Sequence, residues 1–248
     1  SQLLSAVLVV LSLVRAQGMP FQLFPRSMTI HPQPLRAILQ VGIPTALQSV
    51  MYNISNIVIQ TSINSFGTDA VAAWTAYGKM DIIFWMTITA MAQSITTFAG
   101  QNYGAGKYDR LKKGVRVSVA MSAVITLGIS AIMVLFARPI LTVFTPDHDV
   151  LEIGVGMVRF LAPSYITYIL IELLSGAIRG AGKSLVPTLI TVFGVCGLRL
   201  AWIFLAVPLN HSIVMVEASY PITWATTSLA MLLYYCFGRW LAPPKQTL

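Results

Sequence analysis

Long apolar stretches alternate with short polar connections along almost the whole chain. A bilayer core needs about 20 apolar residues in helical form, and six stretches meet that length. We expect them at about 38–65, 70–99, 115–137, 153–176, 186–207 and 213–240. Lipid admits only helices and closed barrels, and runs this long exclude barrel strands. The pattern therefore predicts an all-α fold, a polytopic membrane protein with a six-helix transmembrane bundle over residues 38–241.

The two ends of the chain differ from this bundle. Residues 1–14 are apolar but too few to span a bilayer, and no positive region precedes them as it would in a signal peptide. We expect them to be the end of a truncated transmembrane helix, so that the chain is a fragment; a signal-peptide core is the alternative. Residues 15–37 hold four of the thirteen prolines and are expected to form a cytoplasmic linker. Residues 242–248 are expected to form a cytoplasmic tail.

Basic and acidic connections alternate, and this alternation predicts the orientation of the spans. Twelve of the sixteen Lys and Arg residues fall within residues 15–36, 107–116, 179–183 and 239–245. The connections between these basic segments carry Asp69, then Asp147, Asp149 and Glu152, then Glu217. Short loops rich in Lys and Arg stay in the cytoplasm. Two spans are therefore expected between successive basic segments, with the carboxy terminus in the cytoplasm.

Composition agrees with a membrane protein and excludes a nucleic-acid binder. The 248 residues are 56% hydrophobic and 10% charged, with a mean hydropathy of +0.75, whereas a soluble domain has about 25% charged residues. The net charge is +8, but the basic residues stand at the ends of apolar runs, where they would face lipid headgroups. A nucleic-acid binder needs a continuous basic face. The expected partner is the lipid bilayer, with no nucleic acid.

A polar stripe marks the first full span. Polar residues are costly in lipid, so those inside spans are candidates for function. One stands at every fourth position here, and residues four apart lie on the same side of a helix. The members are Gln48, Tyr52, Asn56, Gln60 and Asn64, with Asn53 beside them. Hydrogen bonding between helices is one interpretation, and a water-filled cavity is the one that we favour.

The fourth span carries two aromatic residues and a carboxylate at helical spacing. Tyr165, Tyr168 and Glu172 stand at i, i+3 and i+7, so they are expected to share one helix face. Such a face suits an organic cation, through its charge and its ring quadrupoles. The alternative is that Glu172 pairs with an arginine at the same helix end, such as Arg179.

Depth in the bilayer predicts a second charged contact. At the helical rise of about 1.5 Å per residue, Arg199 lies about 12 Å and Asp81 about 18 Å from the outer ends of their spans. Glu172 lies nearer the inner face, so an Asp81–Arg199 ion pair is expected. A carboxylate in such a site can exchange H⁺ or bind Na⁺. With no cation expected on its face, Glu172 is the predicted proton exchanger, and Asp81 is predicted to be structural.

Three segments of the chain resemble the multidrug and toxic compound extrusion (MATE) transporters. Val41-Gly42-Ile43-Pro44 opens a span, and the string Gly-Gln-Asn-Tyr-Gly-Ala-Gly at 100–106 closes the next one. The string Ser-Gly-Ala-Ile-Arg-Gly-Ala-Gly follows the fourth span at 175–182. The resemblance covers almost the whole chain. Residues 38–240 are similar to the family's seventh to twelfth helices, and residues 1–14 to the end of its sixth.

This resemblance implies a twelve-helix fold of two six-helix bundles, of which the chain is the carboxy-terminal half. The amino-terminal six-helix bundle is then its missing partner. The implied activity is multidrug efflux: export of cationic, amphipathic organic compounds by antiport with Na⁺ or H⁺, through alternating access. No other cofactor and no enzymatic activity are expected. The expected location is the plasma membrane, the inner membrane of a prokaryote.

The sequence departs from the family at its ion site. Several branches carry a carboxylate on the seventh helix, where Tyr52 and Asn53 stand here, and another on the tenth helix, at the position of Tyr168. Either Glu172, one turn later, substitutes for that acid, or coupling resides mainly in the missing half, and we expect the second. The candidate substrate- and ion-binding residues are therefore Tyr52, Asn53, Asn56, Gln60, Asp81, Tyr165, Tyr168, Glu172 and Arg199. The one metal considered is Na⁺, near Glu172 or Asp81.

Other classes of membrane protein fit the sequence less well. A flippase of the same superfamily, moving a lipid-linked saccharide, would need a strongly basic cavity to hold a pyrophosphate. The charges within the spans are instead balanced, with Lys79 and Arg199 against Asp81 and Glu172. A membrane-embedded enzyme would need a histidine or paired carboxylates near one interface, and none is so placed. A structural membrane protein would leave the polar stripe unexplained.

Overall fold

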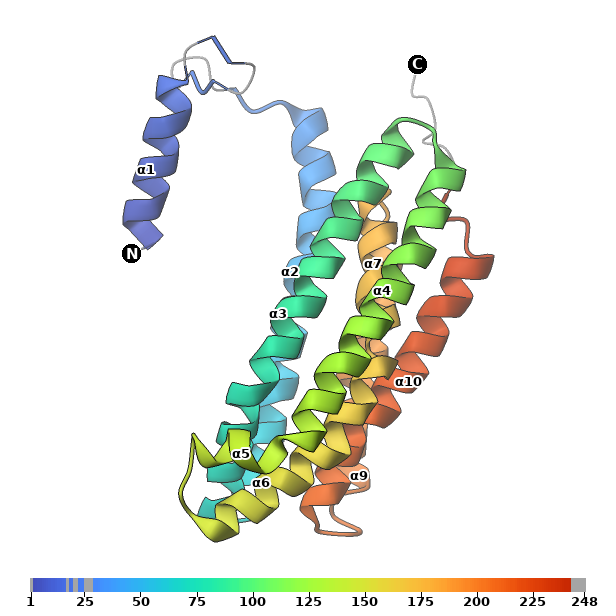
Figure 1. Cartoon of the computed structure of the whole chain (residues 1–248). Helices are drawn as coiled ribbons and strands as arrows, with labels where there is room; N and C mark the ends of the chain where they lie inside the picture. Colours follow the sequence, from blue (N-terminus) through green and yellow to red (C-terminus); the bar gives the residue numbers. More distant parts are fainter. Residues whose placement is uncertain (1, 17, 20–21, 25–28, 242–248) are drawn as a thin grey trace. The chain divides into compact units, whose positions relative to one another are not determined.

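The computed structural model describes residues 2–16, 18–19, 22–24 and 29–241, and over these residues the regular structure is entirely helical (Figure 1). The chain divides after Leu39 into two units. The first contains α1 (Gln2–Arg15) and the beginning of α2 (Pro32–Asn64), and the second runs on from Gln40. The expected tail at 242–248, and residues 1, 17, 20–21 and 25–28 of the amino-terminal segments, lie outside the described residues.

The second unit continues with a series of helices. In chain order they are α3 (Thr68–Gly104), α4 (Tyr108–Leu135), α5 (Ala137–Thr142), α6 (His148–Leu161), the 3₁₀ segment η2 (Ala162–Thr167), α7 (Ile169–Gly180), α8 (Leu185–Thr191), the π-helical segment η3 (Val192–Gly197), α9 (Leu198–Leu205) and α10 (Ile213–Phe237). The 3₁₀ segment separates α6 from α7, and the π-helical segment separates α8 from α9.

Four stretches of the described chain are long and apolar enough to cross a membrane. They are Thr68–Gly104, Tyr108–Leu135, His148–Gly180 and Leu185–Leu205. Helices α2 and α10 are long enough, at 33 and 25 residues, but are not among these four. Their crossing, and with it the count of six spans, stays a prediction. Helix α1 has 14 residues, too few to span a bilayer alone.

The structure departs from the expected spans at three places. Helix α2 begins at Pro32, inside the segment 15–37 that was expected to be a linker, because proline is compatible with a first helical turn. The fourth span changes to 3₁₀ geometry at η2, where Pro163 has no N–H to donate. The fifth contains η3, where Gly194 lies against α10: a Cβ there would be 2.3 Å from the Thr227 hydroxyl oxygen.

Helices α3 and α7 approach each other closely, backbone against backbone. A Cβ atom on Gly180 would lie 2.4 Å from the carbonyl oxygen of Thr96, and one on Gly176 would lie 2.9 Å from that of Ala92. Small residues at four-residue spacing allow helix backbones to approach in this way. Gly100 faces Gly180 in the same contact: a Cβ added at Gly100 would lie 3.3 Å from the carbonyl oxygen of Gly180. The two glycine-rich strings of the sequence therefore meet in space.

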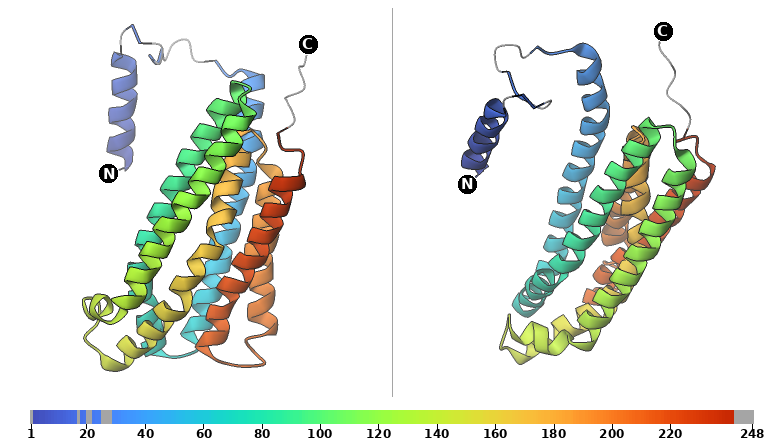
Figure 2. Two further views of the ribbon diagram at one scale, coloured as in Figure 1. Left: turned by 45° about the vertical axis from the view of Figure 1, so that its right-hand side comes forward. Right: turned by 45° about the horizontal axis from the view of Figure 1, so that its top comes forward.

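Both strings also end their helices in the same manner. Gly106 and Gly182 have φ angles of 69° and 76°, which glycine adopts without steric cost. In each case the next residue, Lys107 or Lys183, donates its backbone N–H to a carbonyl five residues earlier, at 2.8 and 3.1 Å, as in a Schellman motif. Figures 1 and 2 show these two basic connections at one end of the second unit, and the acidic connection between α5 and α6 at the other.

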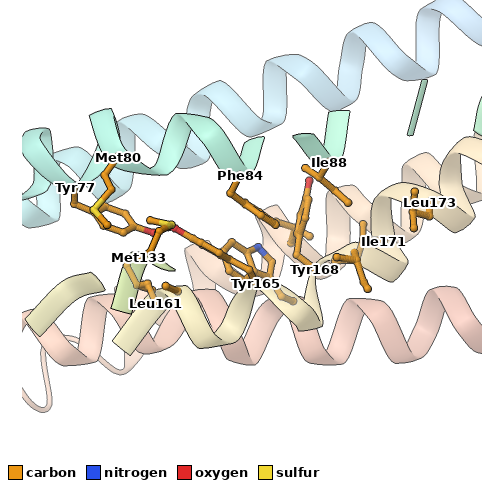
Figure 3. Packing of buried hydrophobic residues seen from close by; sticks show 14 of the residues in the cluster. Tyr77, Met80, Phe84, Ile88, Met133, Leu161, Tyr165, Tyr168, Ile171 and Leu173 are labelled. Carbon is orange, nitrogen blue, oxygen red and sulfur yellow. The ribbon is translucent and has the colours of Figure 1, made fainter. Parts of the chain in front are cut away.

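The main core of the second unit fills the space between α3, α7 and their neighbours. Figure 3 shows Tyr77, Phe84 and Ile88 of α3 lying alongside Tyr165 and Tyr168. The rings of Phe84 and Tyr165 stack at 4.0 Å between centroids, with 6° between their planes. A smaller buried cluster joins the second half of α2 to α9 and α10, and consists of Ile59, Ile63, Ile203, Val207 and Val216.

We expect Gly180→Ala to lower the free energy of unfolding by about 1–3 kcal/mol, because overpacking a tight contact forces the backbones apart. The added methyl group would meet a backbone oxygen, which cannot move aside as a side chain can. Thermal unfolding in detergent, followed by tryptophan fluorescence, measures the effect. Gly128→Ala in α4 is the matched control, since no atom lies within 4 Å of its added Cβ. Equal melting temperatures for the two variants would contradict the prediction.

Candidate functional site

A cavity of about 530 Å³ lies within the second unit, bordered by α2, α3, α9, α10 and the residue that joins η2 to α7. Its wall combines seven aromatic side chains with a few polar ones. The lining residues are Tyr52, Asn56, Ile59, Gln60, Trp74, Tyr77, Gly78, Asp81, Trp85, Tyr168, Arg199, Tyr220 and Trp224. Six of the nine sequence-predicted site residues are among them. Asn53, Tyr165 and Glu172 are not.

Helix α3 contributes one continuous face to the cavity. Trp74, Tyr77, Asp81 and Trp85 follow one another at intervals of three or four residues, which places them on the same side of a helix. Asp81 is the one residue of this face that was predicted from the sequence as a site residue. Its aromatic neighbours carry the same periodic signal as the polar stripe of α2 and could have been found by it, as could Tyr220 and Trp224 of α10.

Asp81 is held by two aromatic donors. The Tyr165 hydroxyl donates to one carboxylate oxygen and the Trp85 indole N–H donates to the other. Tyr165 is fully buried behind the cavity wall, and its hydroxyl oxygen lies 2.8 Å from that of Tyr77. The carboxyl group therefore has a fixed orientation while it remains on the cavity wall.

The expected Asp81–Arg199 ion pair is wrong. The Arg199 guanidinium lies 4.0 Å from the centroid of the Tyr220 ring and donates to the Thr223 hydroxyl at 3.5 Å. Within the described chain it has no carboxylate within ion-pair distance, although its side chain is only 2% exposed. Depth alone could not locate its partner, because two residues at one depth can point in different directions around their helices.

Glu172 pairs with Arg179, which was the alternative expected from the sequence. Its carboxylate lies 3.7 Å from the Arg179 guanidinium and accepts a hydrogen bond of 2.8 Å from Tyr168. The expectation that no cation shares its face is therefore wrong. The expected common face of Tyr165, Tyr168 and Glu172 is also wrong for Tyr165, which turns to Asp81 instead. Tyr165 reaches Asp81 on α3, whereas Tyr168 reaches Glu172 along its own helix.

The polar stripe of α2 enters the cavity only along its middle. Tyr52, Asn56 and Gln60 line it, and the Tyr52 and Tyr168 hydroxyl groups share a hydrogen bond of 3.3 Å on its wall. Gln48 and Asn64 stand outside, because four residues exceed one helical turn and the stripe rotates by about 40° at each step. Asn53 donates to the Ser49 carbonyl at 2.9 Å and is exposed outside the cavity.

The cavity therefore offers a carboxyl group, a guanidinium and a set of aromatic faces to a guest. Such a wall can hold an organic molecule by ring contacts and orient it by its charges. Over the described residues, no group of three or more His, Cys, Asp or Glu side chains is arranged to hold a metal ion.

Comparison with known proteins gives the same architecture. The chain is 24% identical over 241 residues to the "Probable multidrug resistance protein YoeA" of Bacillus subtilis, covering 94% of this chain and 51% of that protein. It is 24% identical over 172 residues to the "Probable multidrug resistance protein NorM" of Thermotoga maritima, covering 69% of this chain and 37% of that protein. The chain thus spans about half the length, or less, of these relatives.

Solved structures share the fold at low sequence identity. A MOP superfamily transporter from Pyrococcus furiosus superposes with a TM-score of 0.85 at 17% identity, over 94% of this chain and 53% of that one. An outward-facing multidrug resistance MATE family transporter gives a TM-score of 0.82, also at 17% identity, over 94% and 53%. The MatE family matches residues 44–205, which is more than half of the sequence. The chain therefore belongs to the MatE family of membrane transporters.

Proposed function

We propose that this chain is the carboxy-terminal half of a secondary transporter that exports cationic, amphipathic organic compounds in exchange for Na⁺ or H⁺. The observation that carries the proposal is the placement of Asp81 on an otherwise largely aromatic cavity wall. At about 530 Å³, the cavity has the size of pockets that hold drug-sized molecules.

The chemistry of the wall favours an organic cation. Ring faces attract a positive charge through their quadrupoles, and more strongly where water is excluded. Asp81 adds a carboxyl group to the same wall, beside Trp85 and Tyr77. Arg199 is the one basic residue lining this cavity in the described chain, and its guanidinium lies over Tyr220. A cation would therefore bind against α3, where the carboxyl group is.

The relatives support the transport class and the half-length architecture. Those named above are multidrug resistance proteins and transporters, about twice as long as this chain, so transport is favoured over enzymatic activity. We propose that an amino-terminal six-helix bundle completes the cavity and that the two bundles alternate access around it. The proposed location is the plasma membrane, with the carboxy terminus in the cytoplasm.

The coupling ion is proposed to bind mainly in that other half. Glu172, the carboxylate nearest in sequence to the family's acid on the tenth helix, already holds Arg179 and accepts from Tyr168. It reaches the cavity only through the Tyr168 hydroxyl. We therefore assign Glu172 a secondary part in coupling.

A lipid-linked saccharide flippase fits the cavity less well. A pyrophosphate headgroup would call for several cations on the wall, and Arg199 is the single basic side chain among the lining residues described above.

Asp81→Asn is expected to reduce efflux of a fluorescent organic cation from proteoliposomes of the complete transporter by about 10- to 100-fold, because a hydrogen bond or contact to a charged partner is worth roughly 1.5–3 kcal/mol. The measurement is made under an imposed pH gradient and separately under a Na⁺ gradient. Asp109→Asn, an exposed carboxylate in the first turn of α4, is the matched control and should leave efflux unchanged. No efflux by the unaltered transporter under either gradient would refute the antiporter proposal.

Glu172→Gln is expected to reduce coupled efflux by a smaller factor than Asp81→Asn. The amide can still accept from Tyr168 but no longer neutralises Arg179, so the support of the cavity wall weakens. Efflux is compared across a series of external pH values in the same proteoliposomes. Transport identical to the unaltered protein at every pH would remove Glu172 from the mechanism.

A further inference from the structure

A second cavity, of about 340 Å³, lies between α6 and α10. It shares no lining residue with the central cavity. Its wall is formed by Glu152, Ile153, Gly156, Met157, Phe160, Ile213, Val214 and Glu217. Both helices begin close by, so the cavity stands near the end of the bundle that carries the acidic connection (Figure 2).

Glu217 is the unusual member of this wall. It is only 2% exposed, and within the described chain it makes neither a hydrogen bond nor an ion pair. The other two carboxyl groups inside the bundle, Asp81 and Glu172, each have at least two partners. Burial of an unpaired carboxylate is costly, so a cationic guest beside Glu217 would offset a cost that the fold itself leaves uncompensated.

The other charged groups around the cavity leave this carboxyl group unneutralised. Glu152 of α6 already binds the Arg138 guanidinium and lies 3.9 Å from the His148 ring. Arg138 is thereby directed to Glu152. The remaining wall is apolar, with Met157 of α6 and Ile213 of α10 on its two sides and the Phe160 ring among them.

We propose that this cavity binds a small organic ammonium compound with an apolar body. The ammonium group would donate to Glu217, and the apolar body would lie against Phe160 and Met157, where ring and sulfur contacts accommodate it. The site is separate from the central cavity and does not depend on the transport function proposed above.

Cysteine protection at Gly156 tests the proposal in the purified chain. Gly156 lines the cavity and is exposed, and an added Cβ there meets no atom within 4 Å. Gly156→Cys is made with Cys236→Ser, which removes the exposed native thiol and leaves only the buried Cys196. The rate of maleimide labelling is then measured with phenethylammonium as the probe and with 2-phenylethanol as its neutral counterpart.

Phenethylammonium at a concentration of about twice its dissociation constant is expected to slow the labelling about threefold, because only the empty site reacts and about one third of the sites are then empty. The neutral alcohol should not slow it. Glu217→Gln should abolish the protection, whereas Asp109→Asn, at an exposed carboxylate of α4 that does not line this cavity, should retain it. Protection by both compounds alike, protection that survives Glu217→Gln, or no protection at any probe concentration would overturn the proposal.

A thermal melt distinguishes misfolding from loss of binding. Glu217→Gln removes an unpaired buried charge and should not lower the melting temperature. A variant that melts normally and labels at the unprotected rate supports the site. Because the readout comes from the α6–α10 cavity and involves no transport, its outcome is independent of whether the central cavity exports cations.

Discussion

The contact between α3 and α7 at Gly176 and Gly180 is the constraint on which the rest of the second unit depends. Lipid tails are as apolar as side chains, so helices in a membrane associate chiefly through close packing and polar contacts. Backbone atoms of α3 occupy the space that side chains at these two positions would need. This approach also brings the α7 end of η2 against the middle of α3, where Tyr165 stacks on Phe84 and reaches Asp81. The glycine-rich strings thus have a structural role, remote from the cavity they help to shape.

Aromatic residues have two roles around the central cavity. Trp85 and Tyr168 line it and also donate to carboxylates, one to Asp81 and the other to Glu172. Tyr220 lines it and lies beneath the Arg199 guanidinium. The charged groups are therefore fixed by the same rings that a guest would contact. This arrangement keeps ionisable side chains in place without pairing the acid of α3 with the base of α9.

Hydropathy and helical spacing predicted much of this arrangement. They located α3 and α4, although α4 begins seven residues before the expected span, and the family strings indicated the transporter family to which the chain belongs. They could not reveal η2 or η3, since a 3₁₀ or π segment has the same hydropathy as the α-helix around it. Helical spacing correctly predicted that Tyr52, Asn56 and Gln60 line the cavity. Depth in the bilayer predicted the wrong partner for Asp81, because depth does not say in which direction a side chain points around its helix. Glu217 was counted only as a charge near a loop, and nothing in the sequence indicates that it is buried and unpaired.

The 3₁₀ segment η2 makes the region between α6 and α7 sensitive to twist. Residues advance by about 120° in a 3₁₀ helix and by about 100° in an α-helix. Over the three residues from Tyr165 to Tyr168, rewinding to α geometry would therefore rotate one ring against the other by about 60°. Only one of the two phenols could then keep its carboxylate. Such a twist of this short turn would cost one of the two acids its tyrosine donor, so the local winding of the backbone links the two charged networks mechanically.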